Sequence, residues 1–542
     1  MILRRWLSLA LILLCAVGVQ AQDTVPVTVE RHPRATTPLH CSGRFVTYDL
    51  DHVTTVPGGD DVRQFEANGS GLAINDLDND GDLDVVLANH AGANTILWNE
   101  GDFQFRTERL GQGMSRAVNI VDIDGDGWND LFFTRIASAP NYWRNLGDGT
   151  FEQEILSYIA EPLYSTSWAD LDDDGDLDLV GGTYDAELLN ALGPDFLLTG
   201  RGGVYYYEND EGIFRPQRLA PEAQALALIL ADTNDDGRLD IIVGNDFAVR
   251  DYIWLNTADG WVADDYFENT TYSTMSYDFA DVNNDGTTEF FSTDMKPYAT
   301  DDETTEAWQP LMDDMMDDPH PIGDPQVMAN VLQVTGTEGF LNRAAGWGID
   351  ATGWSWSSKF GDLDQDGFVD LYVVNGFIEQ TMFAHLPDHE LVEENQAFRN
   401  RNGQGFLVMP EWDLASTYSG RAMSMADLDG DGDLDIVVNN LRGPAQLFEN
   451  QLCSGRSLQV DLHWPESANP SAIGSLVTLV TDMGDLQRTI RSSSGYLSGD
   501  PSRLHFGYPA STNLLALKII WPDGGQSEIE LTGHEALLTI SR

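Results

Sequence analysis

Short apolar runs rich in β-branched and aromatic residues recur along the chain, and an acidic segment containing glycine precedes each of them. Clear examples are LDVVLAN, NDLFFTR, LDIIVGN, VDLYVVN and LDIVVNN. Runs of this composition are typical of β-strands, and acidic residues with glycine are typical of tight turns. The pattern therefore predicts an all-β chain in which a strand enters and a strand leaves each acidic turn.

The acidic segments share one pattern. DLDNDGDLD at residues 76–84 returns as DIDGDGWND, DLDDDGDLD, DTNDDGRLD, DVNNDGTTE, DLDQDGFVD and DLDGDGDLD, beginning at residues 122, 170, 232, 281, 362 and 427. We call these segments loops 1 to 7. Each has an acid at position 1, Asp or Asn at 3, Asp at 5, Gly at 6 and an acid at 9. Alternating oxygen ligands around a glycine turn are what a hard cation such as calcium requires.

The predicted calcium ligands occupy positions 1, 3, 5 and 9 of each loop. They are Asp76, Asp78, Asp80 and Asp84; Asp122, Asp124, Asp126 and Asp130; Asp170, Asp172, Asp174 and Asp178; Asp232, Asn234, Asp236 and Asp240; Asp281, Asn283, Asp285 and Glu289; Asp362, Asp364, Asp366 and Asp370; and Asp427, Asp429, Asp431 and Asp435.

Two other interpretations of the loops were weighed. An EF-hand places a bidentate Glu at position 12, but that position holds Leu87, Phe133, Gly181, Val243, Ser292, Val373 and Val438. The EF-hand interpretation therefore fails in every copy. Solvated acidic turns are a simpler alternative for a single copy, but seven copies in register favour about seven calcium sites.

The spacing of the loops predicts the architecture. Successive loops begin 46, 48, 62, 49, 81 and 65 residues apart, near the roughly 40 to 50 residues of a propeller blade once insertions are removed. We predict a seven-bladed β-propeller over residues 60–450, with a linear β-solenoid as the alternative. The N-terminal segment 22–59 includes RFVTYDL at 44–50, which could supply the outer strand that closes the last blade.

The N-terminal residues 1–21 combine Arg4 and Arg5, an apolar run and a small-residue ending, which is typical of a secretory signal peptide. The run is too short to span a bilayer. Its removal leaves Cys41 and Cys453 on either side of the repeats, either paired in an oxidising compartment or as two free thiols. We expect a secreted protein, extracellular, at the cell surface or in the periplasm.

The charge of the chain limits its partners. The formal net charge is -59, whereas nucleic acids and anionic membranes demand basic surfaces. No later stretch is long and apolar enough for membrane insertion. An extracellular protein or glycan ligand is the remaining expectation.

These residues carry a family resemblance. The loops resemble those of FG-GAP or VCBS repeat proteins, which include integrin α-subunit propellers. Asp294 to Pro297, Asn330 to Gln333 and the run at 352–376 are similar to the bacterial branch of the cartilage acidic protein-like family. AIGSLVTLVT, SSSGYLSGDPSRLHFGY and LKIIWPDGG, within 456–542, resemble the ASPIC/UnbV domain of that branch, with Gly499 as a small departure. The resemblance implies a propeller with calcium loops, a C-terminal β-domain and an extracellular interaction.

Other candidate sites are weaker. We find no GxSxG, GxxxxGK or HExxH motif. Pro387 separates His385 from His389 and disfavours a paired metal site, and the segment MDDMMDDPHPIGDP at 312–325 mixes soft and hard ligands. Trp354 and Trp356 share one face of a strand, either as core residues or as a platform for a sugar ring.

Insertions at 184–204, 294–329 and 376–400 interrupt the repeats where loops should lie, and such loops on a rigid scaffold often bind ligands. The main hypothesis is a secreted binding or adhesion scaffold with structural calcium. The alternatives are an enzyme acting on extracellular polysaccharide and a partner-binding subunit of a cell-surface complex.

Overall fold

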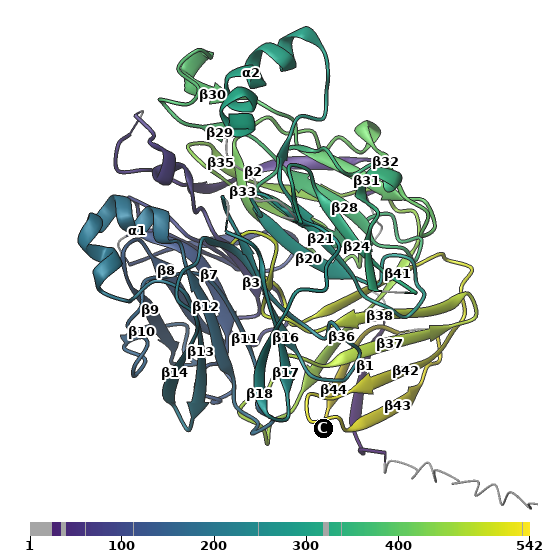
Figure 1. Ribbon diagram of the computed structural model, residues 1–542. Coiled ribbons are helices and arrows are strands. Elements are labelled where there is room, and N and C mark those ends of the chain that lie inside the picture. The colour runs from purple at the N-terminus through teal and green to yellow at the C-terminus, as the bar shows by residue number, and fades with distance from the viewer. Residues whose placement is uncertain are drawn as a thin grey trace, which may run out of the picture.

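The computed structural model describes residues 24–542, except 34–39, 60, 112, 248, 318–324, 338 and 534. The predicted signal peptide lies outside the described residues. The described chain is nearly all β, as predicted (Figure 1). None of its helices is long and apolar enough to cross a membrane.

Each acidic loop joins the first two strands of a four-stranded antiparallel array. The sheets of loops 1 to 3 are, in strand order, β3 (Leu72–Asn75), β4 (Asp84–Leu87), β5 (Asn94–Asn99) and β6 (Phe105–Leu110); β7 (Ser115–Val121), β8 (Asp130–Arg135), β9 (Ser138–Asn145) and β10 (Phe151–Glu154); and β11 (Leu163–Ala169), β12 (Asp178–Thr183), β13 (Val204–Asp210) and β14 (Ile213–Ala220). The sheets of loops 4 and 5 are β15 (Ala225–Ala231), β16 (Asp240–Asn245), β17 (Tyr252–Thr257) and β18 (Gly260–Asp264); and β20 (Ser276–Ala280), β21 (Glu289–Thr293), β24 (Val331–Gly336) and β25 (Gly339–Asn342). The sheets of loops 6 and 7 are β27 (Ser357–Gly361), β28 (Asp370–Val374), β31 (Gln396–Asn400) and β32 (Phe406–Val408); and β33 (Gly420–Ala426), β34 (Asp435–Asn440), β35 (Pro444–Asn450) and β2 (Phe45–Val53).

These sheets form a closed ring. The first strands β3, β7, β11, β15, β20, β27 and β33 contact one another in that order, and β33 contacts β3. All seven are fully or almost fully buried. The ring confirms the predicted propeller architecture and excludes the linear solenoid.

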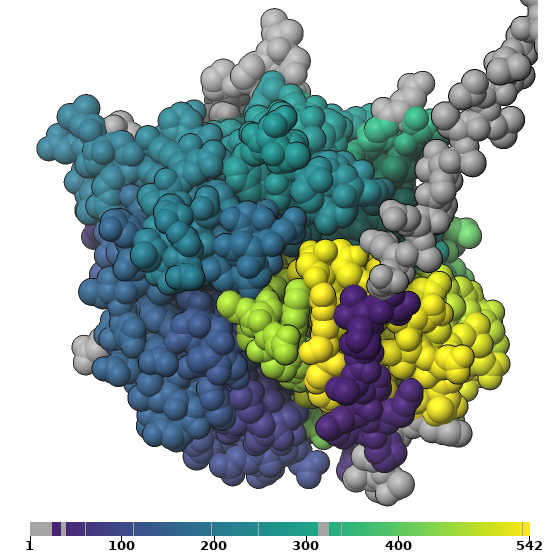
Figure 2. All heavy atoms as spheres, turned by 90° about the horizontal axis from the view of Figure 1, so that it is seen from below, coloured from purple at the N-terminus to yellow at the C-terminus, as the bar shows by residue number. Residues whose placement is uncertain are grey.

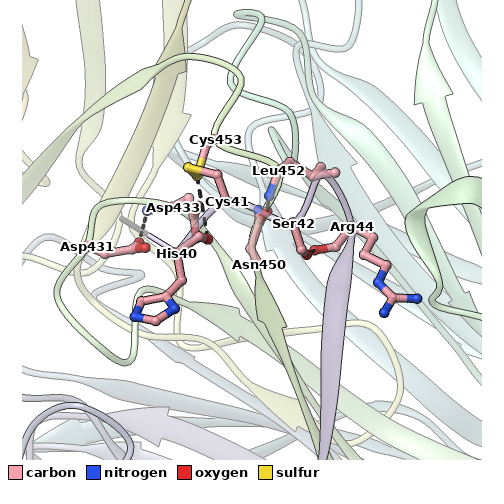
Figure 3. Close-up of a disulfide and its surroundings, with 9 residues drawn as sticks. All are labelled: His40, Cys41, Ser42, Arg44, Asp431, Asp433, Asn450, Leu452 and Cys453. Atoms are coloured by element: carbon pink, nitrogen blue, oxygen red, sulfur yellow. Dashed lines mark hydrogen bonds between the residues drawn. A yellow bond between two sulfur atoms is a disulfide. The ribbon is translucent and has the colours of Figure 1, made fainter. Parts of the chain in front are cut away.

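The last sheet of the ring closes with a strand from the opposite end of the chain. The predicted segment 44–50 lies in β2, which pairs antiparallel with β35 from Phe45 and Asn450 onward. The disulfide between Cys41 and Cys453 links the segments that flank these two strands. Figure 3 shows the disulfide beside Asp431 and Asp433 of loop 7. The two cysteines are therefore paired, which excludes the alternative of free thiols.

The insertions build the face of the ring that carries the labels α1 and α2 in Figure 1. They contain α1 (Asp185–Leu192), the 3-10 turns Pro194–Leu198 and Pro387–His389, and α2 (Asp302–Asp317). Short two-stranded pairs lie at their bases: β19 (Thr270–Thr271) with β23 (Gln326–Val327), β22 (Met295–Lys296) with β26 (Gly353–Trp354), and β29 (Phe377–Ile378) with β30 (Glu390–Leu391). The short helix α3 (Ala344–Trp347) and the 3-10 turns Gln64–Ala67 and Pro410–Trp412 complete the helical elements of the described chain.

The C-terminal domain consists of two four-stranded sheets. One is β1 (Thr28–Pro33), β44 (Glu535–Ser541), β36 (Arg456–His463) and β41 (Leu504–Tyr508); the other is β38 (Gly484–Thr489), β37 (Leu476–Thr481), β42 (Leu514–Ile520) and β43 (Gln526–Glu530). Figure 2 shows the yellow C-terminal domain against the ring, with the purple N-terminal segment lying across it. The sequence did not indicate that β1 belongs to this domain.

A hairpin of the C-terminal domain fills the centre of the ring. Its short strands are β39 (Ser493–Ser494) and β40 (Ser498–Gly499), and β40 pairs in parallel with β3. The buried Tyr496 at its tip shares a hydrogen bond of 2.6 Å with the Tyr164 hydroxyl, and the Gly495 N–H donates to the Tyr277 carbonyl at 2.6 Å. We call residues 492–500 the plug, because they contact strands on several sides of the ring.

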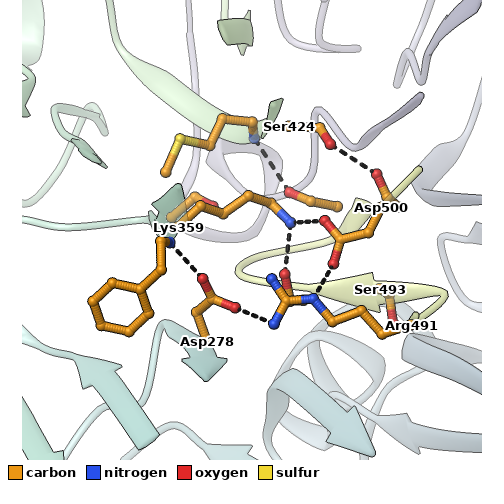
Figure 4. Close-up of polar contacts among 12 residues, drawn as sticks. Asp278, Lys359, Ser424, Arg491, Ser493 and Asp500 are labelled. Atoms are coloured by element: carbon orange, nitrogen blue, oxygen red, sulfur yellow. Dashed lines mark hydrogen bonds and ion pairs between the residues drawn. The ribbon is translucent and has the colours of Figure 1, made fainter. Parts of the chain in front are cut away.

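Three buried charges and the partly buried Arg491 fix the plug in the ring (Figure 4). The Lys359 ammonium pairs with Asp500, and the Arg491 guanidinium reaches Asp500 at 2.9 Å and Asp278 at 2.7 Å. Asp278 also accepts a hydrogen bond of 2.6 Å from the Phe360 N–H. Two cations and two anions balance, so burial of this cluster leaves no net charge uncompensated.

Removing the disulfide is expected to destabilise the fold. The Cys41→Ser, Cys453→Ser double variant should lose about 2–5 kcal/mol of unfolding free energy, because the bond closes a very long loop of the unfolded chain. Urea denaturation measures the loss, and reduced wild-type protein is the matched comparison. Equal stability of the variant and the oxidised wild type would contradict the prediction.

Breaking the buried charge cluster is expected to cost more than breaking an exposed pair. Asp500→Asn should lower the unfolding free energy by about 3–5 kcal/mol, because it leaves Lys359 and Arg491 with one fewer buried anion. The control Asp413→Asn breaks the exposed pair with Arg44 and should change stability little. Similar urea midpoints for the two variants would show that the cluster does not anchor the plug.

Candidate functional site

The seven acidic loops adopt the same backbone geometry. In each loop the N–H of the glycine at position 6 donates to the carboxylate at position 1, at 2.7 to 3.0 Å. These glycines have φ between 86° and 99°, a conformation that L side chains rarely adopt. The glycine at position 6 is therefore required by the turn that points the acids inward.

The acid at position 9 joins its loop to the sheet. One of its oxygens accepts the N–H of position 2, as in Leu77 to Asp84 at 2.9 Å, and this bond is present in all seven loops. The other oxygen of Asp84 accepts the N–H of Asn99 at 2.8 Å. The acid at position 9 thus holds the loop to the sheet and also adds negative charge to the loop.

The structure brings positions 1, 3 and 9 together in five loops. One carboxylate oxygen from each lies within 4.8 Å of the others in loops 1, 2, 3, 6 and 7. Loops 4 and 5 have the amides Asn234 and Asn283 at position 3, and both amide oxygens accept the N–H of position 5. The acid at position 5 is not part of these five close groups. In loops 1, 2 and 3 its carboxylate accepts a hydrogen bond from the N–H of position 7.

The donor set fits a hard divalent cation. Buried carboxylate oxygens of Asp76, Asp78 and Asp170 have no hydrogen-bond donor, although they lie among other acids. Burial, with neighbouring acids, raises the pKa of Asp76 to about 6 and that of Asp170 to about 7. Buried oxygens without donors and with a high proton affinity are the environment that a cation with oxygen ligands stabilises.

Asparagines that the sequence analysis did not assign to the site connect neighbouring loops. Asn145 Nδ2 donates to the carbonyl of Leu77 in loop 1 at 2.8 Å, and Asn99 Nδ2 donates to Leu428 in loop 7 at 2.7 Å. Asn256, Asn400 and Asn450 make the same bond to loops 3, 5 and 6. We call these residues the clamp asparagines. Their sequence signal is an Asn at or next to the end of the third strand of a repeat, often with a glycine two or three residues later.

The C-terminal domain covers part of the loop face of the ring. Gln459 Nε2 donates to Asp427 at 2.5 Å, and the carbonyl of Gly432 in loop 7 contacts the imidazole of His505 at 3.1 Å. Of the predicted ligands, none is exposed in loops 6 and 7, whereas position 5 is exposed in each of the other five loops. The loops and the C-terminal domain therefore form one continuous interface.

The three insertions meet on the other face, where they line a groove of about 850 Å³. Its lining includes Asn190 from α1, Leu311 from α2 and Gln380 from the third insertion, together with Arg63 and Phe65 from the segment before β3. Arg63, Asn190 and Gln380 are exposed. The groove thus presents hydrogen-bonding side chains on an apolar floor.

The structure also decides some of the weaker candidate sites from the sequence. Trp354 and Trp356 are only 4% and 2% exposed, and Trp354 stacks on Phe377 with ring centroids 4.3 Å apart. They are core residues, and the sugar-platform interpretation is wrong because their faces are covered. The imidazole of His385 contacts the Ala307 carbonyl, and no acid or histidine cluster joins it to His389 among the described residues. Most of the segment 312–325 lies outside the side chains that are described.

Comparisons with known proteins agree with this geometry. The family model for the FG-GAP-like repeat matches residues 76–133, 122–181, 232–292 and 388–438, and the model for ASPIC and UnbV matches residues 465–542. Cartilage acidic protein 1 of Xenopus tropicalis is 30% identical over 101 residues, a match that covers 16% of this chain and 15% of that relative.

Solved structures give distant likenesses. A lectin from Burkholderia pseudomallei matches with a TM-score of 0.46 and 9% identity, covering 71% of this chain and 96% of the lectin. The Neurospora crassa Pan2 WD40 domain matches with a TM-score of 0.42 and 7% identity, covering 76% and 98%. These likenesses do not bear on function, and the family assignment comes from the repeat and C-terminal models. The chain is an FG-GAP-like repeat protein with a C-terminal ASPIC and UnbV domain.

Proposed function

We propose that this protein is a secreted, calcium-stabilised scaffold that binds an extracellular protein or glycan. The observation that carries the calcium role is in loop 1, where Asp84 at position 9 is held by two backbone N–H groups beside carboxylate oxygens of Asp76 and Asp78 that have no donor. FG-GAP-like repeat proteins are typically extracellular, which supports the location.

Calcium has a structural role in this proposal. The residues that hold it are those at positions 1, 3, 5 and 9 of each loop, and when bound the ion supplies the positive charge that the crowded carboxylates lack. The chain itself supplies the turn through glycine at position 6 and the clamp through position 9. Occupied loops stabilise the interface with the C-terminal domain, because Asp427 also accepts the Gln459 amide.

The groove between the insertions is the proposed ligand site. It lies on a rigid ring and is lined by inserted segments that are not part of the repeat. Loops that a rigid scaffold holds in place commonly form ligand-binding sites. A polysaccharide-cleaving enzyme remains the second hypothesis. It is weaker because Glu379, the buried acid among the described groove residues, already accepts the Thr381 and Met382 N–H groups.

Calcium removal is expected to lower thermal stability strongly. With excess EGTA the melting temperature should fall by about 10 °C or more, because each ion held only by the folded state contributes about 2.7 kcal/mol at one hundred times its dissociation constant. Differential scanning calorimetry measures the shift, and adding back calcium, but not the same concentration of magnesium, should restore it. An unchanged melting curve in EGTA would overturn the calcium role.

Ligand binding is expected to depend on the groove. Calcium-loaded protein should be retained by one member of a panel of extracellular polysaccharides and matrix proteins without releasing new chain ends. Arg63→Ala with Gln380→Ala should weaken retention by about tenfold, since lost hydrogen bonds to a ligand cost about 1.5 kcal/mol in total. Arg215→Ala, on the outer strand β14, is the matched control. Release of new chain ends would make the protein an enzyme instead.

A further inference from the structure

The residue immediately before the clamp asparagine differs in charge from repeat to repeat. In β9 it is Arg144, in β31 it is Arg399, and in β35 it is Glu449. The backbone of the asparagine that follows is fixed in each case by a hydrogen bond of 2.8 or 2.9 Å to the acid at position 9. One register position of the sheet therefore presents a cation to some loops and an anion to another.

Both arginines bind the acids of their own loops. Arg144 Nε lies 2.6 Å from Asp124 and its Nη2 lies 3.1 Å from Asp126. Arg399 repeats this arrangement, with Nε 2.5 Å from Asp364 and Nη2 2.9 Å from Asp366. In each loop the guanidinium spans positions 3 and 5, which are two of the four predicted ligand positions.

Glu449 has the opposite effect on loop 7. Its side chain is fixed by the Tyr48 hydroxyl, which donates to it at 2.7 Å, and it is only 9% exposed. Glu449 occupies the register position of Arg144 and Arg399, and the next residue, Asn450, donates its N–H to Asp435 of loop 7 at 2.9 Å. Loop 7 also carries an additional acid, Asp433, at position 7. This loop therefore has more negative charge near its ligand positions than loops 2 and 6.

We infer that the residue before the clamp asparagine sets the calcium affinity of each loop, with loops 2 and 6 as weak sites and loop 7 as a tight one. The inference rests on the proposed calcium role. In loops 2 and 6 a calcium ion must displace a guanidinium from the oxygens at positions 3 and 5. In loop 7 the residue at this position is Glu449, whose carboxylate attracts the ion.

This difference makes the ring respond to calcium in steps. As the calcium concentration falls, loops 2 and 6 release their ions first, and Arg144 and Arg399 close on the acids that the ions leave. Both arginine side chains are partly exposed, at 36% and 44%, so they can move aside when calcium returns. An arginine at this position therefore keeps its loop folded at low calcium.

The test compares variants that change this one position. Arg144→Gln with Arg399→Gln should lower the calcium concentration that half-saturates the weak class of sites by about tenfold, because one positive charge near each ion is removed. Glu449→Gln, which can still accept the Tyr48 hydrogen bond, should weaken calcium binding at one tight site by about fivefold, because one negative charge near the ion is removed. Equilibrium dialysis in chelator-buffered calcium gives the number and affinity of the bound ions.

Arg109→Gln is the matched control, because it also removes an arginine from an aspartate pair, here with Asp51, but at the end of β6 that lies away from Asn99 and loop 1. Circular dichroism at saturating calcium checks that every variant is folded. If the arginine variant and the control give the same binding curve, the inference is wrong while the calcium role stands. If the wild type binds no calcium at all, the proposed function itself fails.

Discussion

The central constraint on this fold is the burial of many carboxylates close to one another. Burial raises their pKa because the charged form loses hydration, and neighbouring acids add to the effect. The chain offsets part of this cost with backbone N–H groups aimed at positions 1 and 9 of every loop. Buried oxygens of Asp76, Asp78 and Asp170 still lack a donor, so these loops contain positions where a cation would stabilise the folded state.

The ring and the C-terminal domain behave as one structural unit in this geometry. The clamp asparagines connect loops of neighbouring sheets, including Asn99 of the first sheet to Leu428 of the last. The C-terminal domain then packs on the same loop face and places Tyr496 in the centre of the ring. Because the plug occupies the centre, a ligand must bind to an outer surface, and the insertion groove of about 850 Å³ is one hollow on such a surface.

Much of this arrangement could be predicted from sequence. The repeated acidic turns predicted the loops and the ring, whereas the flanking cysteines left a disulfide and two free thiols as alternatives, between which the structure decides. The plug could not be predicted, because SSGYLSGD is a polar segment whose partners lie on several repeats that only the folded ring brings together. Strand β1 is mostly exposed and lacks apolar alternation, so it gave no strand signal. Trp354 was ambiguous because a core face and a binding face have the same alternation.

The way the two ends of the chain are joined has a consequence for biosynthesis. Strands β1 and β2 emerge first, yet their partners β44 and β35 are made last. The ring cannot close, and its centre cannot fill, until nearly the whole chain has been made. Contacts of such long sequence separation form slowly and leave strand edges open in the meantime. The early repeats must therefore persist as an incomplete arc while the rest of the chain is made, and at this stage their open strand edges are available to chaperones.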